Sequence, residues 1–179
     1  PGEYGEITDE QMWDNLTYFL KAVIPVAEQA GVRMALHPDD PPVSPIEGVA
    51  RILGSHSGLR RLVETVPSDC NGLDFCQGAV AAMPESVLDA IRYFGSRNKI
   101  VYVHFRNISG TAPRYAETFI DEGYVNMAEA MAAYKEVGFS GTMIDDHVPT
   151  MSDDPEKYRS RAYAMGYIKA LMDAVGGPD

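Results

Sequence analysis

The chain has 179 residues, 45% of them hydrophobic and 23% charged, a composition typical of a globular protein with one ordinary core. Its formal net charge of −11 argues against a nucleic-acid partner, because proteins that bind a phosphate backbone usually carry a basic patch. No apolar run approaches the roughly 18 residues that a membrane span needs. The opening "PGEYGEITDE" lacks the basic and apolar regions of a signal peptide. We therefore expect a single domain over residues 1–179 that binds neither nucleic acid nor membrane.

The first half of the chain alternates helical and strand-like segments. Thr8, with Gln11 three residues later, forms a capping-box pattern that predicts the start of a helix, and Gly31 is a suitable end for it. "VRMALH" (32–37) predicts the first strand. A proline-rich loop then leads to a short helix expected near residues 46–53 and another over about 59–65. "NGLDFC" (71–76) predicts the second strand, and His56 is interpreted as a surface loop residue.

The second half repeats this alternation. Pro84 is placed where the first turn of a helix tolerates proline, so a helix is expected directly after it. "KIVYVHF" (99–105) predicts the third strand, and Asn126 is a candidate cap for a helix that ends near Gly138. "GTMIDD" (141–146) predicts the fourth strand, and a last helix is expected over about 158–175. Strands alternating with helices indicate an α/β fold with a parallel sheet.

Four strand–helix units in series correspond to half of an eightfold TIM (βα)8 barrel. Half a barrel would leave unpaired backbone groups on its two outer strands. We therefore expect a partial barrel of about four C-terminal βα units, completed by a missing N-terminal half or by a second copy in a homo-oligomer. An open four-stranded sheet standing alone is the alternative.

A residue able to bind a metal ends each predicted strand. These residues are His37, Cys76, His104 and the pair Asp145/Asp146. Active sites of βα barrels lie at the carboxyl ends of the strands, so these side chains could converge although they are far apart in the sequence. Two imidazoles, a thiolate and a carboxylate can enclose a divalent first-row ion, and the thiolate by itself favours Zn²⁺, Fe²⁺ or Co²⁺.

Each of these residues also has an ordinary structural interpretation. A single histidine at a strand end is often only hydrogen-bonded, a single cysteine is often a small core residue, and paired aspartates often form turns. Four such residues at the same end of four successive strands favour a shared metal site. Cys70 and Cys76 are the two cysteines of the chain, so we do not expect a disulfide framework. We expect the protein to reside in a reducing cytoplasm.

Four motifs together resemble the mannonate dehydratase family. They are "LHPDDPP" (36–42), "NGLDFCQG" (71–78), "VHFRNI" (103–108) and "DHVPT" (146–150), and they correspond to about the C-terminal half of the family pattern. The resemblance implies a xylose-isomerase-like barrel and the dehydration of D-mannonate to 2-dehydro-3-deoxy-D-gluconate with Mn²⁺ or a similar divalent ion. It places the metal ligands at His37, Cys76, His104 and Asp146.

The resemblance also assigns a catalytic role to His147, as acid or base, with a purely hydrogen-bonding role as the alternative. One departure from the family pattern concerns substrate recognition. The family often has an arginine and a proline before its Asp-His pair, whereas this chain has Ile144 and Asp145. If the family arginine binds substrate, the sugar acid taken by this chain can differ.

Several other residues are candidates for contacts with the sugar acid. Tyr163 could protonate the leaving hydroxide, although core packing is the alternative for it. Arg106 shares a strand face with His104 and could hold the substrate carboxylate bidentately, with a surface ion pair as the alternative. Asp39 and Asp40 could bind hydroxyls, orient a ligand histidine or form a turn. Arg161 is a further cationic candidate of lower rank.

Two other functions remain open at this stage. A sugar isomerase or epimerase on the same barrel also needs a divalent ion and proton transfer, but such isomerases rely on carboxylates and histidine, so Cys76 favours the dehydratase. The second alternative is a non-catalytic metal-binding remnant of such an enzyme.

Overall fold

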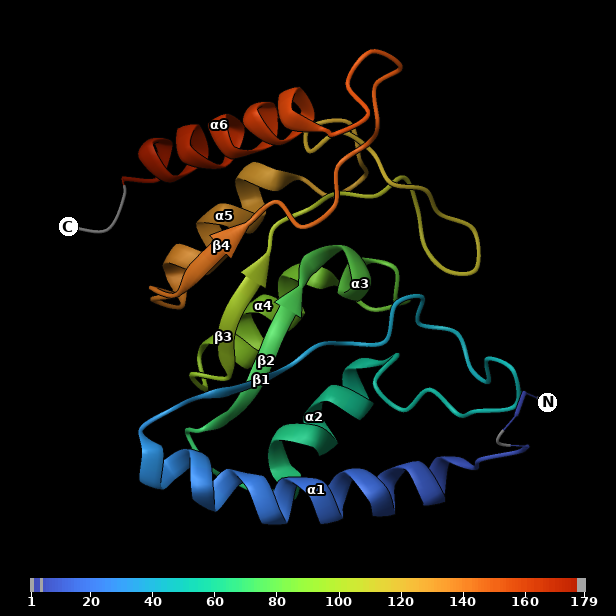
Figure 1. The fold of residues 1–179 in the computed structure, drawn as a ribbon. Helices are drawn as coiled ribbons and strands as arrows, with labels where there is room; N and C mark the ends of the chain where they lie inside the picture. The colour runs from blue at the N-terminus through green and yellow to red at the C-terminus, as the bar shows by residue number, and fades with distance from the viewer. Residues whose placement is uncertain (1, 4, 177–179) are drawn as a thin grey trace.

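The computed structural model describes residues 2–3 and 5–176, and within them the helices and strands alternate along the chain (Figure 1). The strands are β1 (Met34–Leu36), β2 (Asn71–Cys76), β3 (Ile100–His104) and β4 (Thr142–Ile144). The helices are α1 (Asp9–Ala30), α2 (His56–Thr65), α3 (Gln77–Ala81), α4 (Val87–Gly95), α5 (Met127–Glu136) and α6 (Tyr158–Ala174). None of the helices in this described part is long and apolar enough to cross a membrane.

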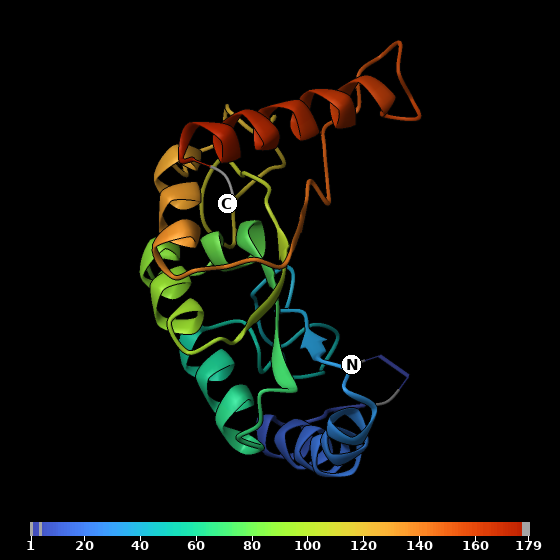
Figure 2. The ribbon, with the colours of Figure 1, turned by 90° about the vertical axis from the view of Figure 1, so that its left-hand side faces the viewer.

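The four strands form one parallel sheet in the order β1-β2-β3-β4, so each strand pairs with the next one in the sequence. Figure 2 shows α2, α4 and α5 along one face of this sheet, while α1 and α6 lie at its two ends. A doubly wound sheet would reverse its strand order and carry helices on both faces. Sequential order with helices on one face is instead the arrangement of a βα barrel.

The two faces of the sheet differ because side chains alternate along each strand. Phe75 is fully buried on the helical face, with its ring centroid 6.2 Å from that of Tyr134 in α5 and 6.5 Å from that of Phe94 in α4. Asp74 and His104 lie on the opposite face and are only partly buried. The hydrophobic core therefore lies between the sheet and its helices, and polar groups occupy the other face.

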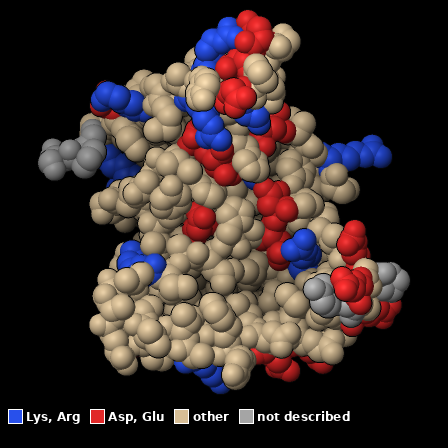
Figure 3. All heavy atoms as spheres, viewed as in Figure 1, with Lys and Arg blue, Asp and Glu red and all other residues tan. Residues whose placement is uncertain are grey.

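That other face is the open, concave side of the molecule. It is turned toward the viewer in Figure 1, and Figure 3 shows it as largely uncharged, with acidic side chains along its middle. The outer strands β1 and β4 each have one neighbouring strand among the described residues. The concave face and the two free strand edges have the geometry of a barrel cut in half.

Several sequence predictions are confirmed at the ends of elements. Thr8 and Gln11 form the expected capping box, and Gly31 ends α1 in the left-handed conformation with φ 65°. Asn126 caps α5 by accepting hydrogen bonds from two backbone N–H groups. β2 has the predicted bounds, and the other strands are shorter than predicted by one or two residues at each end.

Other predictions are wrong for local reasons. Residues 46–53 form no helix, because Ile46 and Val49 pair with each other across a tight turn. The helix expected after Pro84 is present as α4, but its predicted start is wrong: it begins at Val87, and the Ser86 side chain caps it. His56 is not a surface loop residue but the first residue of α2, with 8% of its surface exposed. The short helix α3 was not anticipated.

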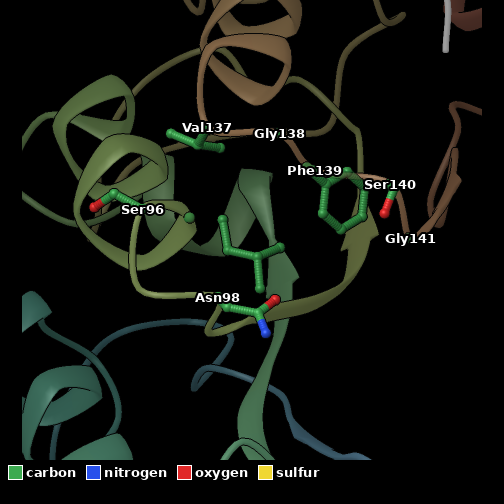
Figure 4. A pocket seen from close by; sticks show the side chains of 9 residues that line it. Ser96, Asn98, Val137, Gly138, Phe139, Ser140 and Gly141 are labelled. Carbon is green, nitrogen blue, oxygen red and sulfur yellow. The ribbon is translucent and has the colours of Figure 1, made fainter. Parts of the chain in front are cut away.

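A small hollow lies at the amino ends of β3 and β4 (Figure 4). It has a volume of about 210 Å³ and is lined by residues of the turns before these strands, including Asn98 and Phe139. Cys76 and His104 are the last residues of their strands and lie at the opposite end of the sheet. In barrels the amino end of the strands serves stability, so the candidate site belongs at the other end.

Candidate metal centre

Three predicted ligands meet at the carboxyl end of the sheet. His37 follows β1, Cys76 ends β2 and His104 ends β3, and one ligand atom of each lies within 4.8 Å of the others. Cys76 is fully buried and is a free thiol, while the two imidazoles are partly buried with ring centroids 5.3 Å apart. Residues separated by 39 and 28 positions are thus brought together because neighbouring parallel strands end side by side.

Asp146 adjoins this group from the segment after β4. Its Oδ2 atom is 3.6 Å from His104 Nδ1 and 3.9 Å from Cys76 Sγ. Its backbone is in the left-handed region, with φ 56°, which is uncommon for a residue with a side chain although Asp adopts it more readily than most. This conformation turns the chain directly after β4 and places the carboxylate beside the sulfur.

Asp145 and Asp146 separate in space despite being neighbours in the sequence. Asp145 is buried, and both its carboxylate oxygens accept hydrogen bonds from Arg161 Nη1 at 3.1 Å. Asp145 therefore ties the end of β4 to α6, whereas Asp146 faces the two histidines. The strand pattern left open which aspartate adjoins the cluster; the carboxylate of Asp146, the one that the resemblance implies, lies beside it.

The donor set fits a divalent first-row ion. His104 Nδ1 is buried and finds no hydrogen-bond partner among the described residues, as expected of a nitrogen reserved for a metal. Two nitrogens, a sulfur and a carboxylate oxygen are ligand types that Zn²⁺, Fe²⁺, Co²⁺ and, through its carboxylate, Mn²⁺ accept. The negative groups are close enough to affect the histidine: burial lowers the pKa of His104, but Cys76, Asp146 and Asp74 together raise it above its usual value.

Asp74 is a member of the site that the sequence analysis missed. Its Oδ2 is 3.5 Å from His104 Nε2, on the side of the ring away from Asp146. Burial raises the pKa of Asp74, and the neighbouring His104 and His37 offset part of that effect. A carboxylate on the second imidazole nitrogen orients a ligand histidine. Alternation along β2 could have indicated this position, since Asp74 and Cys76 share a face.

His147 is exposed at the rim of the cluster, with 58% of its side chain accessible. Its Nδ1 lies 3.2 Å from Glu117 Oε2, and its Nε2 lies 3.7 Å from Asp146 Oδ1. Glu117 was also missed, because it lies in the long loop between β3 and α5, where no periodic pattern marks it. The contact with Glu117 orients the His147 imidazole next to the candidate ligands.

Arg106 is buried beside the same cluster and does not face open solvent. Its side chain is 3% exposed, and its Nε lies 3.3 Å from Cys76 Sγ and 3.1 Å from Asp146 Oδ2. Nη1 lies 3.3 Å from Glu117 Oε1, and Nη2 is paired with Asp40. Although burial lowers the pKa of Arg106, the surrounding acidic groups raise it above its ordinary value, so the guanidinium is charged.

The two aspartates after β1 have different partners. Asp39 accepts a hydrogen bond from the backbone N–H of Leu53 at 2.7 Å, which fixes the proline-rich loop. Asp40 accepts a hydrogen bond from Tyr115 Oη at 2.6 Å and pairs with Arg106. Asp39 therefore has the turn-forming contacts that were one of its three interpretations, while Asp40 belongs to the network around Arg106.

Tyr163 and Arg161 lie on the first turns of α6 and contact groups outside the ligand cluster. Tyr163 Oη donates a hydrogen bond to Asp121 Oδ2 at 2.7 Å, and Arg161 holds Asp145. Within residues 5–176 neither side chain makes a hydrogen bond, ion pair or ring contact with His37, Cys76, His104 or Asp146. The roles predicted for these two residues stay predictions.

Comparison with known proteins agrees with this architecture. Mannonate dehydratase 2 of Halalkalibacterium halodurans is 40% identical over 96% of this chain and 52% of its own length. The crystal structure of mannonate dehydratase from Streptococcus suis serotype 2 matches with a TM-score of 0.86 and 33% identity, over 97% of this chain and 53% of that one. A xylose isomerase-like TIM barrel protein from Mycobacterium smegmatis, 16% identical, matches with a TM-score of 0.67 over 96% of this chain and 54% of that chain, which shows the fold alone.

These matches confirm the expected partial barrel, since the chain spans about half the length of the curated relatives it matches. The family model of D-mannonate dehydratase (UxuA) matches residues 2–177, nearly the whole sequence. The resemblance drawn from four short motifs is therefore confirmed, and the chain belongs to the D-mannonate dehydratase family.

Proposed function

We propose that this chain forms the metal-binding half of an enzyme that dehydrates D-mannonate to 2-dehydro-3-deoxy-D-gluconate. The observation that carries the proposal is the meeting of His37, Cys76 and His104 within 4.8 Å, with Asp146 beside them, in a member of that family. These four side chains are the proposed ligands. Mn²⁺ is the proposed ion, and Fe²⁺, Co²⁺ and Zn²⁺ are the alternatives that the thiolate permits.

The reaction removes a proton from carbon 2 of the sugar acid and hydroxide from carbon 3, and the resulting enol becomes the 2-keto product. A divalent ion held by the four ligands would supply Lewis acidity, which stabilises the negative charge that develops on the substrate carboxylate. The protein itself must then hold the sugar acid and move the two protons.

His147 is the proposed group that transfers a proton. An imidazole exchanges protons near neutral pH, and this one is exposed to a ligand entering the concave face. Glu117 contacts Nδ1 of the ring, which fixes the tautomer and leaves the Nε2 edge for exchange. Tyr163 stays a candidate for protonating the leaving hydroxide only if substrate binding releases its hydroxyl from Asp121.

The proposed partner is the other half of the barrel. The free edges of β1 and β4 and the open face of the sheet are the surfaces that four further βα units would cover. Because the relatives are about twice as long as this chain, a missing N-terminal half is favoured over a homo-oligomer. A cytoplasmic setting is also proposed, since a thiol ligand persists in a reducing compartment.

The test uses the chain together with the N-terminal half of the Halalkalibacterium relative, produced in the same cells. The purified complex is loaded with Mn²⁺ and incubated with D-mannonate, and a 2-keto-3-deoxy acid is expected. Cys76→Ala in the same complex should remove both the metal and the product.

Two outcomes would contradict the proposal. An epimeric sugar acid without a keto product would indicate an isomerase or epimerase. A complex that forms and holds its metal but turns over no sugar acid would indicate a non-catalytic remnant.

A further inference from the structure

The contacts of the buried residue Arg106 do not fit the substrate-binding role that the sequence suggested for it. The sequence suggested that it holds a substrate carboxylate, yet only 3% of its side chain is exposed. Each of its three guanidinium nitrogens already faces a negative partner: Nε faces Cys76 and Asp146, Nη1 faces Glu117, and Nη2 faces Asp40. Each Nη nitrogen keeps a second N–H group, but with the side chain almost fully buried and every nitrogen next to a negative group, little of the guanidinium is open to a bidentate grip on a ligand.

The partners of Arg106 come from every strand end of the sheet. Asp40 follows β1, Cys76 ends β2, Glu117 lies in the loop after β3, and Asp146 follows β4. Arg106 itself comes two residues after the end of β3. One planar side chain therefore contacts all four segments at once, in addition to the Tyr115–Asp40 and His147–Glu117 contacts between pairs of them, and its rigid fork helps to set their relative positions.

Gly78 in α3 is shaped to this side chain. A Cβ atom at position 78 would lie 2.7 Å from Arg106 Cζ and 2.7 Å from Nη1, which is closer than side-chain carbons approach one another. The Arg106 side chain thus packs against the bare backbone of Gly78, two residues after Cys76. Gln77 adds a hydrogen bond from its Nε2 to the backbone carbonyl of Arg106 at 3.3 Å.

We propose that Arg106 is a positioning residue of the metal centre and does not hold the substrate. Its Nε holds Cys76 Sγ and Asp146 Oδ2 side by side, and its other nitrogens anchor it to Asp40 and Glu117. Without this cation, the sulfur and three carboxylates would repel one another and move apart. The inference rests on the proposed metal site, but it concerns ligand placement and not turnover.

The test is Co²⁺ binding, because cobalt reports sulfur ligation through a thiolate-to-metal charge-transfer band in the near ultraviolet. The purified chain carries all four proposed ligands and should show this band. Arg106→Lys keeps the charge but loses the fork, and it is expected to weaken Co²⁺ binding by about 10–100-fold, the usual effect of removing a group that orients a ligand. The charge-transfer band of the variant should weaken or shift as well.

Two further variants keep the test decisive if Arg106→Lys fails to fold. Asp40→Asn preserves shape and removes one anchor of the guanidinium at a position that is 23% exposed, so a smaller shift in the same direction is expected. Arg92→Lys is the matched control, because Arg92 makes an exposed ion pair with Glu136 at 2.9 Å on the helical side and should leave cobalt binding unchanged.

The possible results separate the two proposals. If Arg106→Lys and Asp40→Asn bind Co²⁺ with the affinity and spectrum of the unmodified chain, the positioning role is wrong while the metal site stands. If, in the complex with the other half, Arg106→Lys then raises only KM for D-mannonate, Arg106 holds the substrate. If neither the unmodified chain nor its complex with the other half binds Co²⁺, the metal site and this inference are both wrong.

Discussion

At the scale of single residues, the site combines a buried cluster of potential ligands with one exposed imidazole. Cys76 is fully buried and His104 is partly buried, whereas His147 is 58% exposed at the rim. Residues that hold an ion gain from low solvent access, and a residue that transfers a proton must reach the substrate. The difference in exposure predicts that the two tasks can be separated by substitution.

His147→Asn should preserve metal content and remove most of the activity. The substitution keeps a polar group of similar size beside Glu117 but cannot exchange protons, so kcat should fall by about 10²–10⁴-fold. Metal analysis and turnover of D-mannonate by the assembled barrel are the measurements. Activity close to that of the unmodified protein would show that His147 only forms a hydrogen bond at the rim.

Asp146→Asn, in contrast, should weaken metal binding. Asparagine tolerates the left-handed backbone at this position and has nearly the same shape, so the fold should persist. The lost negative charge should lower the affinity for a divalent ion by at least about tenfold, as removal of a ligand requires. Isothermal titration with Mn²⁺ measures this affinity. Asp145→Asn is the control, because it removes a neighbouring negative charge that contacts Arg161 and not the proposed ligands.

At the scale of elements, the loop between β3 and α5 is organised by one buried side chain. Asn107 Nδ2 donates hydrogen bonds to the carbonyls of Ile120 and Val125 at 3.0 Å, and its Oδ1 accepts from the N–H groups of Ile108 and Val125. This side chain adds to the loop's few backbone pairings, which include the bridge between Ile108 and Glu117. The loop carries Glu117, so its stability bears on the site as well.

Asn107→Ala should therefore destabilise the chain by about 2 kcal/mol or more, because several buried polar groups lose their partners at 1–3 kcal/mol each. Urea denaturation measures this change. Asn107→Asp would bury a carboxylate and set one of its oxygens against the carbonyls of Ile120 and Val125, so it should destabilise the chain at least as much as alanine does. A change below about 0.5 kcal/mol for Asn107→Ala would show that water replaces these contacts.

His56, at the amino end of α2, should make the stability of the chain depend on pH. Burial is the main reason why the pKa of His56 lies below its usual 6.5. Below about pH 6.5 the unfolded chain binds more protons than the folded chain, so the free energy of unfolding should fall as the pH decreases from there. His56→Gln should reduce this slope between about pH 6.5 and 5 in urea titrations, and an unchanged slope would contradict the assignment.

The elements also show how far a sequence can be interpreted. The strands that end at Cys76 and His104 were predictable because a short apolar run that ends in a polar residue has few alternatives, and parallel strands place their ends together. The place of Glu117 in the site was not predictable, because it depends on a loop that folds around Asn107 through contacts distant in sequence. His56 was misassigned because "SHSG" suggests a loop, whereas Ser55 acts as a helix cap.

At the scale of the whole molecule, the structure is one half of a closed architecture. Exposed apolar residues on α1 are consistent with a surface that is covered in the complete protein: Phe19 is 49% exposed and Val26 60% exposed. They are seven positions apart and therefore share one face of the helix. Scattered exposed hydrophobic residues are common, but this pair lies on the helix that flanks the free edge of β1 (Figure 1).

The chain and the N-terminal half of the Halalkalibacterium relative should therefore form a one-to-one complex that melts at a higher temperature than the chain alone, because association stabilises only the folded form. Val26→Lys should weaken this complex while leaving the melting temperature of the isolated chain nearly unchanged, since the side chain is already exposed there. Gln29→Lys adds the same charge to an exposed position of the same helix and is the matched control. Sedimentation velocity distinguishes the outcomes. A stable homodimer that does not exchange with the N-terminal half would mean that two copies of this chain close the barrel, and the metal site would then occur twice, once from each copy.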